Sequence, residues 1–256
     1  MTILAWALLA CAHKASVAPS PRADEVDAIL ARATSRVLPA PGLKATFHID
    51  VRFEDDGGST IGALVLHPPD DLRVEIQTPF HTPLLIAATD GTAIHAYVAK
   101  GNVFLRGDDA VAALAAFAGD AIHPADLIEL LAGIPPLGAA TLVSKEPIPG
   151  GVRARYDGPA GTVIRIDVDA ETAALRTFEV DRSDAQIFVA SYGEPLKGTP
   201  YPRSLQVKSP VLGLRLDFQH WEQLGAVPDV FTLQPPPNSV ERDLVEVLEE
   251  LSAPPP

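Results

Sequence analysis

The sequence contains a single cysteine among its 256 residues, which excludes an internal disulfide and a zinc site built from several cysteines. Basic residues are also few, because 20 lysines and arginines stand against 33 aspartates and glutamates, and they form no cluster. A nucleic-acid-binding protein would carry a basic face, and anionic lipid would repel a chain with a net charge of −13. We therefore expect no nucleic-acid partner and no electrostatic attachment to a membrane surface.

The sequence also lacks catalytic motifs, since it has no G-x-S-x-G, no phosphate-binding glycine loop and no H-E-x-x-H. Three pairs of carboxylates fall where turns or a helix start are expected, and turn formation and N-capping account for them: Asp55-Asp56, Asp70-Asp71 and Asp108-Asp109. Four histidines lie on neighbouring predicted strands without metal-binding spacing: His48, His67, His81 and His95. We expect no enzyme activity, no metal and no cofactor; a hydrolase without a recognisable motif is the weakest alternative.

The N-terminus begins with an apolar run over residues 3–10 that is far too short to span a bilayer. The run is typical of the apolar region of an export signal, although no lysine or arginine precedes it. Leu8-Leu9-Ala10-Cys11 resembles a bacterial lipobox, in which the signal is removed and the cysteine is lipidated. We predict a signal peptide over residues 1–10 and a lipidated Cys11 with a tether over residues 11–22. The alternative is a disordered start with a chance cysteine, or a misassigned start codon.

Residues 43–106 form a series of short segments in which apolar and polar side chains alternate, separated by turn residues. This period of two is typical of strands with one buried and one solvent-exposed face. Alternation assigns six apolar residues to the buried faces of two of these segments: Phe47, Ile49, Val51, Leu72, Val74 and Ile76. Consecutive strands of this kind predict an antiparallel meander, which must curl or pack on another layer.

Helical spacing of apolar residues predicts helices over residues 23–38, 108–119, 124–133 and 240–251. From about residue 141 the alternating strand segments resume and continue to residue 219. No linker separates the two groups of strands, so we predict one mainly β domain over residues 23–237. Its fold would be a curved antiparallel sheet covered on its concave side by a few helices, followed over residues 238–256 by a C-terminal helix and a proline-rich tail.

The order of these pieces resembles the LolA/LolB family of lipoprotein carriers over residues 23–237. The resemblance rests on a helix before the first strand, a helical insertion between the strand groups, and short segments of sequence. These segments are GLKATF at 42–47, GALVL at 62–66, LRVE at 72–75, Pro79-Phe80 and Asp90-Gly91. VFTLQPP at 230–236 resembles the closing strand of the family.

The resemblance implies a half-open β-barrel whose apolar hollow holds the acyl chains of lipoproteins or lipids. The six alternating residues would line this hollow. Aromatic residues make up only 6% of the chain, which leaves few large side chains to fill a wide curled sheet. Cys11 would anchor the protein on the periplasmic face of the outer membrane, where a periplasmic carrier protein is the implied partner.

One loop departs from the family pattern. Anchored carriers place an apolar residue at a protruding loop tip, whereas residues 55–59 between the first two strands are polar or small. This departure argues against a membrane-inserting role for the loop. A separate alternative hypothesis is that the protein is an envelope scaffold or assembly lipoprotein. Such a protein would keep the same fold and bind a protein partner through the open edge of its sheet or its C-terminal helix.

Overall fold

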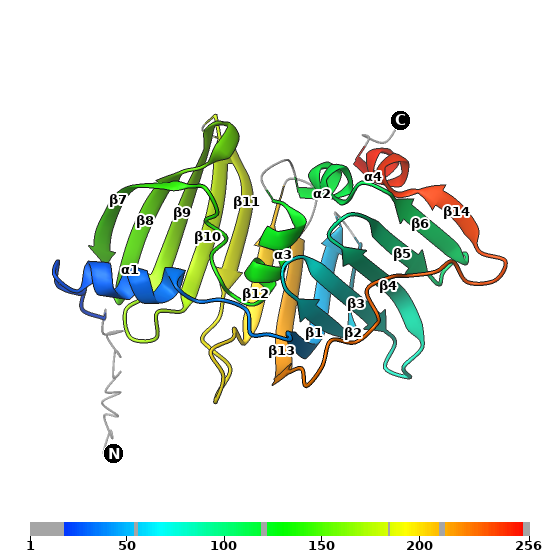
Figure 1. Ribbon diagram of the computed structural model, residues 1–256, viewed down its shortest axis with the longest axis horizontal. Helices are drawn as coiled ribbons and strands as arrows, with labels where there is room; N and C mark the ends of the chain where they lie inside the picture. Colours follow the sequence, from blue (N-terminus) through cyan, green and yellow to red (C-terminus); the bar gives the residue numbers. More distant parts are fainter. Residues whose placement is uncertain (1–17, 54–55, 119–121, 184, 210–212, 253–256) are drawn as a thin grey trace, which may run out of the picture.

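The computed structural model describes residues 18–53, 56–118, 122–183, 185–209 and 213–252. In this part of the chain, fourteen strands form one sheet in the order β14-β6-β5-β4-β3-β2-β1-β13-β12-β11-β10-β9-β8-β7. The sheet is strongly curved, and its two ends, β14 and β7, do not pair with each other (Figure 1). This confirms the predicted half-open, mainly antiparallel architecture.

The predicted meander over residues 43–106 is confirmed, and each of its strands pairs antiparallel with the next. Its strands are β1 (Leu43–Phe53), β2 (Asp56–His67), β3 (Asp71–Gln77), β4 (Pro83–Asp90), β5 (Ile94–Val98) and β6 (Val103–Gly107). The β4–β5 turn shows how local sequence ends a strand. The Asp90 carboxylate accepts hydrogen bonds from the backbone N–H groups of Thr92 and Ala93, and Gly91 has a φ of +81° that favours glycine.

A second meander follows: β7 (Thr141–Ile148), β8 (Gly151–Asp157), β9 (Thr162–Asp169), β10 (Leu175–Arg182), β11 (Ala185–Tyr192), β12 (Ser204–Lys208) and β13 (Gly213–Gln223), with a short 3-10 turn (Pro159–Gly161) after β8. The two meanders become one sheet because β1, the first strand, pairs with β13, the last strand of the second meander. As a result, β7 lies at one end of the sheet and β6 is next to the strand at the other end, although β6 and β7 are consecutive in the chain. The connection between them, α2 (Ala110–Ala118) and α3 (Pro124–Leu131), crosses the concave face.

Helices cover the concave face, as predicted (Figure 1). Helix α1 (Val26–Thr34) is shorter than the predicted helix over 23–38 and packs on β7, β8 and β9. Helix α3 contacts β3, while α2 contacts β6 and α4 (Leu244–Ser252). The main core lies between the sheet and α1 and α3, and a second, smaller apolar cluster lies under α2 and α4.

The C-terminal part of the chain differs from the sequence-based expectation. Residues 230–236 form no strand; they are an irregular segment along the outer face of the sheet, where Arg73 donates a hydrogen bond to the Val230 carbonyl and Phe231 stacks on His67. The prediction of a closing strand is therefore wrong at this place. Proline at 228 and at 235–237 explains the difference, since proline cannot donate to a strand ladder.

The predicted helix over 240–251 begins later than expected. Its first residues form β14 (Val240–Asp243), which pairs in parallel with β6, and the helix α4 follows. Asp243 ends the strand and caps the helix, because its carboxylate accepts hydrogen bonds from the N–H groups of Val245 and Glu246. The segment after residue 237 is thus part of the same sheet.

Gly62 offers a direct test of the packing between β1 and β2. A Cβ atom at this position would lie 2.5 Å from the ring of Phe47 and 2.8 Å from the Glu75 carbonyl oxygen. We expect Gly62→Ala to destabilise the protein by about 1–3 kcal/mol in urea unfolding, because the Phe47 ring must move. Gly58→Ala is the matched control on the same strand, since nothing lies within 4 Å of its Cβ position. Equal unfolding midpoints for the two variants would contradict this packing.

Candidate functional site

The six predicted lining residues lie on β1 and β3, but the described ones do not share one environment. Phe47, Ile49 and Leu72 are buried in the main core at 2%, 5% and 8% exposure. They pack against other apolar side chains. The side chain of Val51 lies outside the described residues. Val74 and Ile76, farther along β3, are half-buried at the border of the core.

These two half-buried residues belong to a larger apolar surface on the concave face. Antiparallel pairing places Val74 opposite Ala87 and Ile76 opposite Leu85, and the same face continues onto β5 and β6. We define the concave patch as six half-buried residues on four consecutive strands: Val74, Ile76, Leu85, Ala87, Val98 and Val103. Sequence reasoning missed the last four members of the patch. Alternation predicts that a segment is a strand, but it does not predict the exposed fraction of each side chain.

Helices border the concave patch on two sides. Helix α3 contacts β3, and α4 contacts β6. Four apolar residues of α4 belong to the same small apolar cluster as the part of the patch on β4, β5 and β6: Leu244, Val245, Val247 and Leu248. The patch is therefore an apolar, partly solvent-accessible strip of the concave face between helical covers.

Helix α3 is fastened at its C-terminal end by two hydrogen bonds from distant parts of the chain. The Tyr192 hydroxyl on β11 donates to the Leu130 carbonyl at 2.9 Å, and Arg36 donates to the Gly133 carbonyl at 3.2 Å. Burial raises the pKa of Tyr192, so its hydroxyl remains a protonated donor. The helix is held over the sheet by β11 and by the segment after α1.

Helix α3 carries two titratable side chains, Asp126 and Glu129. The Asp126 carboxylate accepts a hydrogen bond from the backbone N–H of His123 at 2.9 Å and so closes the N-terminus of the helix. Burial raises the pKa of Asp126, and burial together with the charge of Asp126 raises the pKa of Glu129. Across the described residues, no group of three or more His, Cys, Asp or Glu side chains is arranged to hold a metal ion. The concave patch itself consists of apolar side chains and is therefore suited to contact with apolar groups.

The β3–β4 hairpin, which carries part of the patch, ends in an exposed aromatic ring. Phe80 at its tip is 89% exposed. The tip is locally well defined, because the Thr78 N–H donates to the Thr82 carbonyl and the Thr78 hydroxyl accepts from the N–H groups of Phe80 and Thr82. The family resemblance placed an apolar tip between the first two strands, where the sequence is polar and Asp55 lies outside the described residues. The structure shows one on the β3–β4 hairpin.

Several solved structures have a similar fold. A LolA superfamily protein from Nitrosomonas europaea matches with a TM-score of 0.53 and 12% identity, covering 81% of this chain and 97% of that one. A putative outer membrane lipoprotein-sorting protein domain from Vibrio parahaemolyticus matches with a TM-score of 0.52 and 10% identity, covering 81% and 96%. The chain has a LolA-like fold. A DUF1329 family protein from Desulfovibrio piger shares this fold, with a TM-score of 0.54 and 12% identity over 80% and 95% of the two chains.

At these identities the likeness is one of fold. No protein-family model and no curated protein matches the sequence. The LolA-like fold confirms the predicted architecture, in which helices cover a half-open barrel. Residues that contact a ligand are therefore inferred from the surface of this chain.

Proposed function

We propose that this protein is an envelope carrier that binds the acyl chains of lipoproteins or lipids on the concave patch of its LolA-like half-barrel. The observation that supports the proposal most is the half-buried apolar strip on β3 to β6, bordered by helices. Solved neighbours with this fold include a protein described as lipoprotein-sorting. The carrier would receive or release lipoproteins at the outer membrane, and its chemistry would be binding without a cofactor.

The energetics of the patch favour an acyl ligand. Burying a methylene group is worth about 0.8 kcal/mol, so about ten methylenes laid along the strip would contribute about 8 kcal/mol before ordering costs. The side chains that form the strip are all apolar. A bound acyl chain therefore covers no polar side chain of the strip and causes no loss of hydrogen bonds there.

Uptake of a fluorescent fatty acid by the purified wild-type protein tests the proposal, together with native mass spectrometry of the protein as isolated. We expect saturable uptake and a co-purifying acylated species. The alternative is a scaffold that binds a protein partner. It is favoured by the edge strand β7, on which Leu142 and Val143 are 41% and 48% exposed. A protein that never takes up the probe and retains no acyl chain would support the scaffold instead.

The exposed ring of Phe80 should contact the membrane during transfer. Burying a phenylalanine side chain is worth about 1.5–3 kcal/mol, so we expect Phe80→Ser to weaken binding to neutral phospholipid vesicles by about tenfold or more. Phe80→Leu is the control that keeps an apolar tip and should keep most of the binding. The measurement is vesicle co-sedimentation of protein without its lipid modification. Equal binding by Phe80→Ser and the wild type would exclude this role for the hairpin.

Cys11 lies outside the described residues, and its lipidation remains a prediction from the sequence. None of the helices in the described part of the chain is long and apolar enough to cross a membrane. Several acyl chains on one cysteine would hold the protein stably on a bilayer, where a single chain is marginal. We expect Cys11→Ser to move the protein from the outer-membrane fraction to the soluble fraction, or to stall its processing. Unchanged fractionation would refute the lipobox interpretation.

A further inference from the structure

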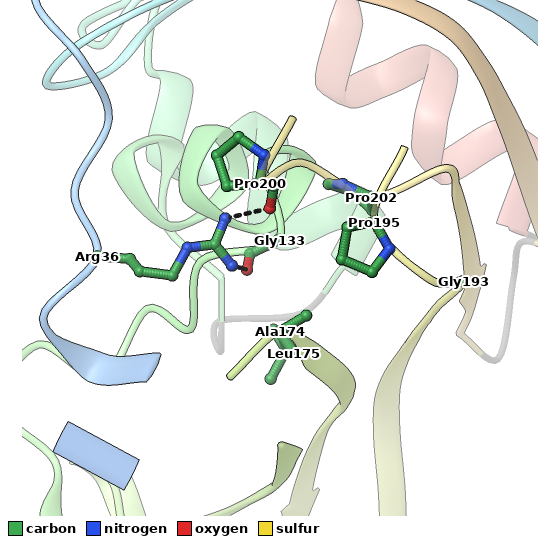
Figure 2. A pocket seen from close by; sticks show the side chains of 8 residues that line it. All are labelled: Arg36, Gly133, Ala174, Leu175, Gly193, Pro195, Pro200 and Pro202. Carbon is green, nitrogen blue, oxygen red and sulfur yellow. Dashed lines mark hydrogen bonds between the residues drawn. The ribbon is translucent and has the colours of Figure 1, made fainter. Parts of the chain in front are cut away.

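A cleft of about 340 Å³ lies among α1, the β9–β10 turn and the β11–β12 loop. Two arginines, Arg32 near the end of α1 and Arg36 just beyond it, line the cleft together with small and apolar residues. The other walls include Thr172 and Ala174 from the β9–β10 turn, and Pro195 and Pro200 from the β11–β12 loop. Figure 2 shows the adjoining inner pocket, into which Arg36 reaches between Gly133 and Pro200. None of these residues belongs to the concave patch.

The two arginines have neutral partners. Arg36 donates to the carbonyl oxygens of Gly133 and Pro200 at 3.2 and 2.7 Å (Figure 2). Arg32 donates to the carbonyl oxygens of Ala170 and Glu171 at 2.9 and 3.4 Å. A guanidinium has five N–H donors, so each arginine keeps further donors for a ligand. Burial lowers the pKa of Arg36, and the electrostatic effect of Tyr201 offsets this only in part.

Other arginines in the described part of the chain have carboxylate partners. Arg153 forms a bidentate pair with Asp167, and Arg176 pairs with Asp169 beside the cleft. The Asp169 carboxylate is paired with Arg176 and also accepts hydrogen bonds from the N–H groups of its own turn, so this pair adds no net charge beside the cleft. Within the part of the chain that the structure describes, neither Arg32 nor Arg36 forms an ion pair. Two uncompensated cations thus share one cleft in a chain with a net charge of −13.

We propose that this cleft binds a phosphate-type anion, held between the guanidinium groups of Arg32 and Arg36. The planar fork of an arginine matches the oxygens of a phosphate group, and charge-assisted hydrogen bonds of this kind are among the strongest. A free phosphate and the head group of a phospholipid present the same chemistry here. The inference does not depend on the acyl-carrier proposal, because the concave patch contributes nothing to this cleft.

Calorimetric titration of the full-length protein at low salt tests the inference in two arms, with inorganic phosphate and with monomeric dihexanoyl phosphatidic acid. We expect saturable binding at one site that Arg36→Gln weakens by about tenfold or more. Arg153→Gln removes the same charge from the pair with Asp167 and should bind as the wild type does. Arg32→Glu, an exposed substitution, gives the same test if Arg36→Gln melts early.

The two arms also identify the source of the anion. Equal affinity for both ligands supports a site for a free anion. Tighter binding of phosphatidic acid that both cleft variants weaken, with dihexanoylglycerol inactive, supports a lipid head group. If neither ligand binds saturably, or if binding survives unchanged in Arg32→Glu, the inference is overturned. Because inorganic phosphate has no acyl chain, the result is independent of fatty-acid uptake on the concave patch.

Discussion

Phe218→Ala is expected to destabilise the fold by about 3–5 kcal/mol, the usual cost of removing a buried phenylalanine ring from a packed core. Phe218 lies on β13 and is 2% exposed. Its ring centroid is 6.0 Å from that of Phe47 in an edge-on contact and 4.6 Å from that of Trp221. Because β1 and β13 are the strands that join the two meanders, the resulting cavity would open at the joint of the sheet. For a chain of this size, the melting temperature should fall by about 10 °C or more.

Phe80→Ala is the matched control, because it removes the same atoms from a side chain that is 89% exposed. A substitution at such a surface position should change the free energy of unfolding by less than about 0.5 kcal/mol. Thermal melting and urea unfolding of the two variants measure the difference. If Phe218→Ala unfolded at the wild-type midpoint, the β1–β13 joint would not be packed as described.

Ile76→Glu is expected to abolish uptake of the fluorescent fatty acid while the protein remains folded. Ile76 is half-buried on the concave patch, so a carboxylate there can still reach water in the free protein. An acyl chain laid across it would bury that charge without a partner, at a cost of several kcal/mol. Affinity should therefore fall by at least about a hundredfold, with a melting temperature close to that of the wild type.

Ile61→Glu provides the control on the opposite face. Ile61 is also half-buried and lies on the neighbouring strand β2, but its cross-strand partners are Gln77 and His48, on the outer face. Both variants replace isoleucine by glutamate, so a difference in uptake between them reports which face of the sheet binds the acyl chain and not the effect of the added charge alone. We expect Ile61→Glu to keep wild-type uptake. Equal loss of uptake in both variants would show that binding does not occur on the concave patch, and unfolding of Ile76→Glu alone would place Ile76 in a closed core.

Local sequence determined the individual elements of this protein. Alternation in β1 and β3 correctly assigned Phe47, Ile49 and Leu72 to the inner face, because successive side chains of a strand point to opposite sides. Helix α3 begins at Pro124 with Asp126 in its first turn, two signals that act within one turn of the chain. The order of strands and helices was also sufficient for the resemblance to LolA-like proteins.

The limits of local pattern show at the C-terminus. Residues 230–236 resemble the closing strand of the LolA/LolB family, but this segment pairs with no strand and runs along the outer face. The Arg73 guanidinium donates a hydrogen bond to the Val230 carbonyl. The prolines on both sides of the segment lack the backbone N–H groups that pairing with a neighbouring strand requires. A strand needs a partner edge with matching hydrogen bonds, and the likeness of one short segment to a family's strand does not show whether such an edge is present.

Only the tertiary structure decided how these elements combine into sites. Pairing of β1 with β13 sends the α2–α3 connection across the concave face. Helix α3 contacts β3, on which Leu72 is buried while Val74 and Ile76 are half-buried. The arginine cleft likewise joins α1 to two distant loops. The sequence determined which side chains face inward, because that depends on the backbone period within a few residues. Exposure and charge balance at a site depend on which distant segments pack there, and this is set by the free energy of the whole fold.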